Sequence, residues 1–182
     1  MSATATTLPT GTWNVDPSHS RVGFRVKHLG ISTVRGEFGK YEGQLVVADD
    51  GTITASGKVD VSSIDTSESD RDTHLKAPDF FDVETYPEIT FRSTSVRAKD
   101  EDTYEITGDL TLHGVTKPIT LIAESGGSEV DPFGNTRIGF EITGQISRSD
   151  YGMKYNMALG SGNLAVSDKI KLDLDVSAVK AS

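Results

Sequence analysis

The chain has 182 residues and a formal net charge of −9 at pH 7. This length predicts one domain with a core of its own. The negative charge argues against nucleic acid or an anionic membrane surface as the main partner, because either would repel the chain at long range. The chain has no cysteine, which excludes disulfides, thiolate nucleophiles and cysteine-ligated metals and leaves the redox compartment open.

The N-terminal segment, residues 1–10, carries neither a cationic stretch nor an apolar run. We expect it to be flexible and to be neither a signal peptide nor a membrane anchor. Elsewhere, no apolar run approaches the roughly 20 residues that span a bilayer. We therefore expect a cytoplasmic protein without stable membrane insertion, with a single domain over residues 11–180.

Alternating apolar and polar residues predict a series of strands that each have one buried face. Turn residues join them: Asp49-Asp50-Gly51 and His113-Gly114 favour tight hairpins, and residues 131–135 favour a longer loop. Consecutive hairpins over one apolar face indicate an antiparallel sandwich or a closed barrel. We favour the barrel, because closure removes exposed edges. The predicted strands cover residues 11–15, 21–28, 36–48, 52–61, 87–97, 103–113, 116–124, 136–147 and 168–178.

Residues 67–77 lack this alternation and are followed by Pro78, so they predict a short helix. Ser67 followed by Asp70 resembles a capping box. Two aromatic residues, Phe80 and Phe81, come directly afterwards. We expect the helix and these rings to cover one end of the barrel, either as a plug over a cavity or as closure of a packed core.

Small residues interrupt the inward faces of three predicted strands. They are Ala55 and Gly57 in the first, Gly108 in the second and Gly144 in the third, each between larger apolar residues. Small inward residues at mid-strand leave volume for a cavity. Each glycine is about equally well explained by bending of a curved sheet, but bending does not explain Ala55.

Two polar residues are expected to face inward at the strand ends. His28 continues the apolar face of its strand, and Arg148 follows Ile146 with the same parity. A few polar groups in an apolar volume are typical of a ligand pocket. Alternatively, Arg148 pairs with a carboxylate such as Asp150 or Asp16 and anchors the loop over residues 148–167.

The case for catalysis is weaker. The four histidines have no spacing typical of a metal site, so we expect neither a metal nor a cofactor. Ser18 and His19 are adjacent, but adjacency alone does not make a nucleophile and its base, and Asp16 favours a loop-anchoring role for His19. One alternative is a hydrolase or isomerase that uses His28 or His19 as base at the barrel mouth. Another is a scaffold whose barrel is filled by its own side chains.

Motifs spread from about residue 11 to 178 resemble the YceI family. The resemblance implies an extended lipocalin-like fold, an antiparallel eight-stranded barrel with one or two short helices. It also implies a tunnel for a polyisoprenoid, with a homodimer as a further implication; many relatives are periplasmic and carry a signal peptide. The motifs are Trp13 to Ser20, Val22 to His28, Gly36 to Phe38, His74 to Phe81, Tyr86 to Phe91, Gly108 to Leu112, Gly114 to Pro118 and Arg148 to Met153.

We therefore predict an all-β barrel that binds one long-chain polyisoprenoid or similar lipid, such as a polyprenyl phosphate, an isoprenoid quinone or a fatty-acid derivative, without altering it. Transport and storage are both open. Apart from the polar groups His28 and Arg148, the predicted contacts are apolar, with Phe80, Phe81, Met153 and Met157 as adaptable gates. The remaining predicted contacts are Phe24, Val26, Phe38, Ala55, Val59, Phe91, Ile106, Leu110, Phe140, Ile142 and Ile146.

Overall fold

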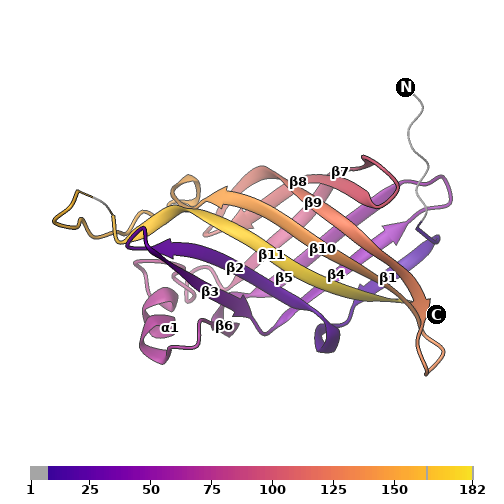
Figure 1. Cartoon of the computed structure of the whole chain (residues 1–182), viewed down its shortest axis with the longest axis horizontal. Helices are drawn as coiled ribbons and strands as arrows, with labels where there is room; N and C mark the ends of the chain where they lie inside the picture. Colours follow the sequence, from indigo (N-terminus) through magenta and orange to yellow (C-terminus); the bar gives the residue numbers. More distant parts are fainter. Residues whose placement is uncertain (1–7, 163, 182) are drawn as a thin grey trace.

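A computed structural model describes residues 8–162 and 164–181. Its strands form one antiparallel sheet that closes on itself where β1 pairs with β11, with Trp13 opposite Lys180 (Figure 1). This confirms the predicted eight-stranded barrel. The barrel strands, in sheet order, are β1 (Gly11–Val15), β4 (Tyr41–Val47), β5 (Ile53–Asp60), β7 (Glu88–Ala98), β8 (Thr103–Leu112), β9 (Val115–Val130), β10 (Thr136–Ser147) and β11 (Val166–Lys180).

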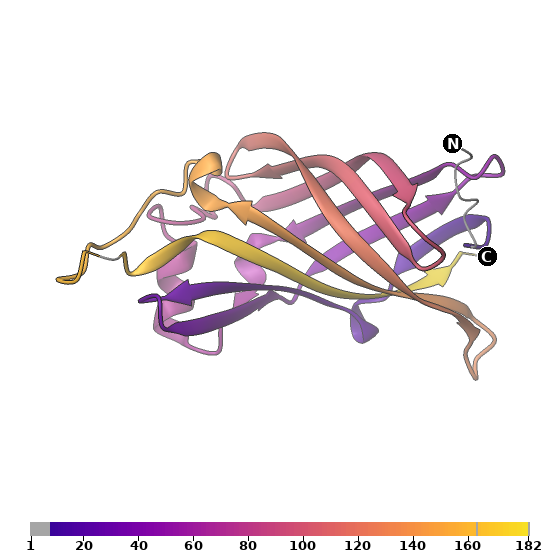
Figure 2. The same ribbon diagram turned by 45° about the horizontal axis from the view of Figure 1, so that its top comes forward.

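Three further strands extend the sheet from β11: β2 (Arg21–His28), β3 (Ser32–Phe38) and the short β6 (Ile64–Asp65). β1 and β2 lie one after the other along the same edge of β11, separated by a 3₁₀ turn over Pro17–His19. β3 pairs with β2 and β6, whereas β4 pairs with β1 and β5. The barrel therefore flares at the end where β2 and β3 diverge from β4 and β5 (Figures 1 and 2).

The single strand predicted over residues 36–48 is wrong. The chain turns at Gly39 and Lys40, and the segments on either side belong to β3 and β4. The turn also changes which residues face inward. Phe38, at an even-numbered position, lines the interior before the turn, and Leu45, at an odd-numbered position, lines it after the turn. Pairing with β2 also makes a strand of residues 32–35, which contain one large apolar residue and carried too weak a pattern to be predicted.

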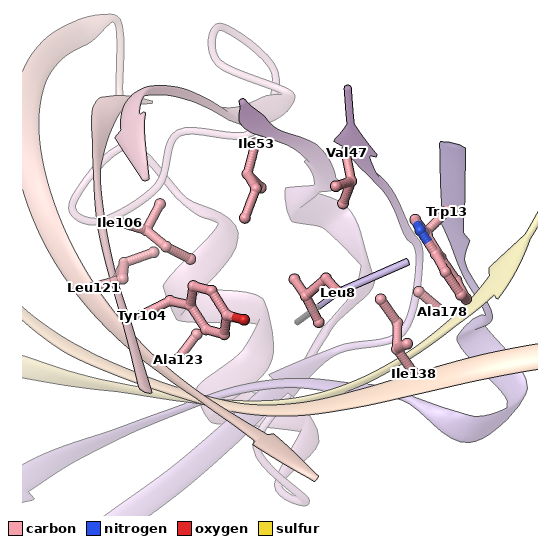
Figure 3. Close-up of a cluster of buried hydrophobic side chains, with 10 residues drawn as sticks. All are labelled: Leu8, Trp13, Val47, Ile53, Tyr104, Ile106, Leu121, Ala123, Ile138 and Ala178. Atoms are coloured by element: carbon pink, nitrogen blue, oxygen red, sulfur yellow. The ribbon is translucent and has the colours of Figure 1, made fainter. Parts of the chain in front are cut away.

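A packed cluster closes the barrel end opposite the flare (Figure 3). Trp13 is fully buried there and donates from Nε1 to the carbonyl of Pro9 at 3.1 Å. Leu8 lies among the side chains of this cluster and is 9% exposed. Of the segment expected to be flexible, residues 1–7 lie outside the described residues. Leu8, in contrast, packs into this cluster and helps to close this end of the barrel.

The helix α1 (Ser69–Lys76) lies beside the flared end (Figure 1). Its N-cap is Glu68, whose carboxylate accepts from the backbone N–H groups of Asp70 and Arg71. The predicted cap at Ser67 is wrong, because Ser67 adopts a left-handed conformation with φ of 66°. No residue of α1 is buried, and Phe80 and Phe81 in the following segment provide most of the apolar cover. Among the described residues, no helix is long and apolar enough to cross a membrane.

Candidate ligand-binding cavity

The interior of the barrel is not filled by its own side chains. A cavity of about 320 Å³ has a lining that extends from Leu8 and Ile53, at the end shown in Figure 3, to Met153 and Val166 at the flared end. Inward side chains of β2, β5, β8, β10 and β11 supply apolar walls because alternate residues of a strand face one side of the sheet. A cavity of this size enclosed by such walls favours an apolar occupant.

Nearly all predicted contact residues border this cavity, although they come from eight separate segments of the chain. His28 and Met157 are the two exceptions. The residues brought together are Phe24, Val26, Phe38, Ala55, Val59, Phe80, Phe81, Phe91, Ile106, Leu110, Phe140, Ile142, Ile146, Arg148 and Met153.

The inward placement expected for His28 is wrong. His28 is exposed at the end of β2, where it pairs with Ser32 across the hairpin and with Val166 of β11. The sheet is irregular between Val166 and Ile170, so strand parity no longer reports the direction of a side chain there. Met157 is 61% exposed in the loop before β11 and lies outside the lining.

The mid-strand small residues divide into two groups. A Cβ at Gly57 would meet nothing closer than the carbonyl oxygen of Glu42 at 3.5 Å, and both Gly57 and Ala55 border the cavity. At Gly108 a Cβ would lie 2.5 Å from the ring of Phe91, and at Gly144 it would lie 2.5 Å from Leu121. Only the small residues of β5 leave open space, because side chains of neighbouring strands cover the other two glycines.

Arg148 is 4% exposed and belongs to the cavity wall. Its guanidinium donates four hydrogen bonds to backbone carbonyls, two in the loop after residue 151 and two at the start of β11. Arg148 thus anchors residues 153–167 as the alternative expected, but the expected carboxylate partner, Asp150 or Asp16, is wrong, because backbone carbonyls accept instead. The acceptors are Ser167 at 3.0 Å from Nε, Met153 and Tyr155 at 2.8 and 2.9 Å from Nη1, and Val166 at 3.3 Å from Nη2.

The charge of Arg148 has no ion-pair partner among the described carboxylates. Burial lowers the pKa of its guanidinium, and Asp168 opposes that shift only through a longer-range attraction. The other charged residues of the lining, Glu42 and Lys58, pair with each other at 3.4 Å. A guanidinium has five N–H donors, and the four bonds leave one on Nη2 without a partner in the described chain.

Sequence reasoning missed the contribution of the last strand. Ile170, Leu172 and Leu174 of β11 line the cavity, and Leu75 of α1 does so at the flared end. The alternation of residues 168–176 predicts an inward aliphatic face and an outward charged one, but this pattern is ordinary for any half-buried strand and does not by itself indicate ligand contact.

The histidines that could serve catalysis do not border the cavity. Nδ1 of His19 lies 2.9 Å from the carboxylate of Asp16, and the ring is exposed, which confirms its loop-anchoring role. His113 contacts the carbonyl of Tyr151 at 2.9 Å, and His74 contacts Asp79 at 3.0 Å. Among the described residues, no three metal-ligating side chains form a group that could hold an ion.

A closed antiparallel barrel of eight strands around an apolar cavity defines a lipocalin-like protein. Residues 13–178 match the YceI-like domain, and the chain belongs to this family. Protein YceI of Escherichia coli O157:H7 is 44% identical over 147 residues, which are 79% of this chain and 75% of that protein.

Solved structures have the same architecture. The YCEI protein of Campylobacter jejuni is 33% identical, with a TM-score of 0.72 over 92% of this chain and 96% of the other. A domain from Saccharophagus degradans, described as polyisoprenoid-binding, is 19% identical with a TM-score of 0.68. That match covers 93% of this chain and 98% of the other, and it supports the shared fold alone.

Proposed function

We propose that this protein binds one long-chain polyisoprenoid or similar amphiphilic lipid inside the barrel and carries or stores it without chemical change. The observation that carries the proposal is the unfilled apolar interior, open along β5 at Ala55 and Gly57. Burial of apolar surface contributes about 25 cal/mol per Å², so a long hydrocarbon chain is the class of ligand that gains most from these walls.

Arg148 supports a polar group at one end of that ligand. Unlike Glu42 and Lys58, which pair with each other, it is a charged residue of the lining without an ion-pair partner among the described carboxylates, and it retains one N–H donor. A phosphate or quinone oxygen would accept from a guanidinium, whereas a plain hydrocarbon cannot. A polyprenyl phosphate or isoprenoid quinone therefore fits this wall better than a hydrocarbon of the same length.

Simple binding accounts for the cavity better than the alternatives do. Neither His19 nor His28 borders the cavity, so a hydrolase or isomerase would lack the base assigned to it. A scaffold with a filled barrel would leave no space beside Ala55. The description of the Saccharophagus degradans domain as polyisoprenoid-binding agrees with the proposed ligand class.

Native mass spectrometry of protein purified from its own host, followed by organic extraction, tests the proposal directly. We expect a bound lipid of defined mass that is released unchanged. An empty, homogeneous protein that also fails to take up added polyprenyl phosphate would overturn the proposal, and turnover of an added ester would favour an enzyme.

Ala55→Phe tests the position of the ligand. The new ring would enter the cavity, so we expect the ligand-free stability to stay within about 1 kcal/mol of the parent while binding of a fluorescent isoprenoid is lost. Val47→Phe is the control, because Val47 is 2% exposed in the packed cluster of Figure 3 and does not border the cavity. Overpacking there should cost about 1–3 kcal/mol. Equal destabilisation of the two variants, or unchanged binding by Ala55→Phe, would contradict a ligand beside β5.

A further inference from the structure

Basic side chains gather on the outer face of β2, β3 and β11, although the whole chain is acidic. Residues 22–36 and 151–167 contain no Asp or Glu, in a chain with 27 acidic residues. On β2 and β11 the cations alternate with residues that line the cavity, so they point outward. We call this surface the basic face; it consists of Arg25, Lys27, Arg35, Lys169 and Lys171.

The strand register places three of these cations side by side. Lys171 is directly opposite Arg25, and Arg25 is directly opposite Arg35. Like charges in directly opposite positions destabilise a sheet. This row is a local cost to stability that a bound anion would relieve.

Few carboxylates lie near this row of three cations. Within the described chain, only Asp173 comes within 4.0 Å of the basic face, at 3.9 Å from Nε of Arg25. That Nε is buried and has no hydrogen-bond partner. The next carboxylate along the sheet, Glu37, is bonded to Arg21 at 2.8 Å. The side chain of Arg25 as a whole is 38% exposed, so an external anion can approach its guanidinium, although not the buried Nε.

Exposed apolar residues lie at the end of the barrel that borders the basic face. Ile31 in the β2–β3 turn is 82% exposed, and Met157 and Leu164 in the loop before β11 are 61% and 54% exposed. One hydrogen bond joins the two turns, from Leu29 to the carbonyl of Ala165 at 2.8 Å, and a second, from Ala165 to the carbonyl of Met157 at 2.9 Å, closes the loop before β11. Both turns project from the flared end (Figure 1). Single exposed apolar residues are ordinary, but three on adjoining turns form a shared tip.

This tip is continuous with the cavity. Val166 lines the cavity and follows Ala165 directly, and Val26 lines it two residues before His28. The exposed tip therefore adjoins the end of the cavity, with the basic face on the outer side of the same strands.

From this arrangement we infer that the flared end docks on an anionic lipid bilayer. Ile31, Met157 and Leu164 enter the apolar part of the interface, and the basic face contacts the lipid phosphates. Each Lys or Arg near an anionic membrane strengthens binding about fivefold, and that attraction decays within a Debye length of about 8 Å at physiological salt. Exposed acidic residues around α1, such as Glu68 and Asp70, lie at the same end of the barrel, so the attraction acts only when the basic face itself is turned toward the bilayer. Docking is therefore peripheral and salt-sensitive, and it is a separate property from lipid binding in the cavity.

Co-sedimentation with vesicles tests the inference, with equal parts of phosphatidylcholine and phosphatidylglycerol compared with phosphatidylcholine alone. We expect the parent protein to prefer the anionic vesicles and to be released by salt. Arg35→Glu combined with Lys171→Glu should lower the partition coefficient by at least about tenfold. Lys99→Glu combined with Lys117→Glu is the matched control: both lysines are exposed, lie outside the basic face, have no ion pair in the described chain and change the net charge equally.

The same samples separate docking from the proposed function. Both double variants should bind a fluorescent isoprenoid in solution as the parent does, and the melting temperature of the Arg35 and Lys171 variant should not fall, since the like-charged row is removed. Ile31→Ser should weaken binding to anionic vesicles without changing cavity binding. Docking is overturned if the parent ignores anionic vesicles, or if the control variant loses binding as strongly as the Arg35 and Lys171 variant. Failure of isoprenoid binding alone would overturn the proposed function and leave docking standing.

Discussion

The guanidinium of Arg148 donates hydrogen bonds to four backbone carbonyls within residues 153–167, and its side chain also borders the apolar cavity. Strand parity was enough to predict that it faces inward. The alternation of inward and outward residues could not identify its hydrogen-bond partners. The acceptors are the backbone carbonyls of Met153, Tyr155, Val166 and Ser167, and every residue has such a carbonyl, so no residue type marks them in the sequence. The same parity failed at His28, where the irregular pairing of β11 interrupts the ladder.

Arg148→Ala should therefore change both stability and ligand preference. Four carbonyls lose their donor, and we expect a loss of roughly 2–4 kcal/mol in the free energy of unfolding, measured with urea. Arg148→Lys keeps the charge but has only three donors, so it should recover part of that stability.

Ligand preference separates headgroup recognition from loop anchoring. If the free Nη2 hydrogen meets a headgroup, Arg148→Ala should weaken a polyprenyl phosphate more than a hydrocarbon of equal length. Titrations of both ligands with delipidated protein give this ratio. Equal losses for the two ligands would limit Arg148 to loop anchoring.

Among the elements, β5 shows that the space beside a mid-strand glycine depends on the side chains of the neighbouring strands. The sequences around Gly57, Gly108 and Gly144 look alike, with a glycine between large apolar residues. The ring of Phe91 fills the space over Gly108 and Leu121 fills it over Gly144, whereas nothing covers Gly57. Which strand lies beside which decides this difference, and that information is absent from any single strand.

Alanine substitutions distinguish the two kinds of glycine. Gly57→Ala adds a methyl group to open space, and we expect stability within about 0.5 kcal/mol of the parent. Gly108→Ala would force a Cβ to 2.5 Å from the Phe91 ring and 2.6 Å from the carbonyl of Arg92, so we expect a loss of about 1–3 kcal/mol. Thermal and urea unfolding of ligand-free protein measure both. A Gly57→Ala variant as unstable as Gly108→Ala would mean that β5 does not border free space.

The point at which a strand ends also depends on pairing with the neighbouring strand. β9 continues to Val130, beyond the predicted end at residue 124, because Gly127 and Glu129 pair with β10. Glycine weakens a strand interior, so the sequence Gly126-Gly127 gives no local indication that the strand continues past residue 124. The hairpin turns, in contrast, are local: the left-handed conformations of His113 and Gly114 suit a tight two-residue turn, and they were predicted correctly.

For the whole molecule, the sequence predicted a closed barrel because successive hairpins over one apolar face leave few other ways to remove edges. It did not predict the flare, which follows from the turn at Gly39 and Lys40. Nor did it predict that Leu8 packs into the cluster that closes the other end. Both depend on contacts between distant parts of the chain. The closure itself joins residues as far apart as Trp13 and Lys180.

An ion-pair network reinforces this closure. Arg137 of β10 bonds to Asp16, beside the junction of β1 and β2, at 2.8 Å, and to Asp131 in the β9–β10 loop at 2.7 Å. The hydrogen bond from Arg137 is the main cause that lowers the pKa of Asp131 to about 2. Hydrogen bonds from Ser18, Arg137 and His19, in that order, lower the pKa of Asp16 further below its ordinary value. The barrel closure is therefore linked to the ionisation of two carboxylates.

Acid should remove the stabilisation that Asp131 provides. Because its folded pKa of about 2 lies below the ordinary value near 3.9, its contribution is present at neutral pH and is lost as the pH falls toward 2. Asp131→Asn keeps the shape of the side chain but never carries the charge. We expect this variant to melt below the parent at pH 6, and the gap to shrink steadily between pH values of about 4 and 2. Asp109→Asn is the control, since Asp109 is exposed and has no ion pair within the described chain, and it should melt with the parent throughout. A gap for Asp131→Asn that stays constant down to pH 2 would show that its carboxylate stabilises the loop through hydrogen bonds to the backbone rather than through its charge.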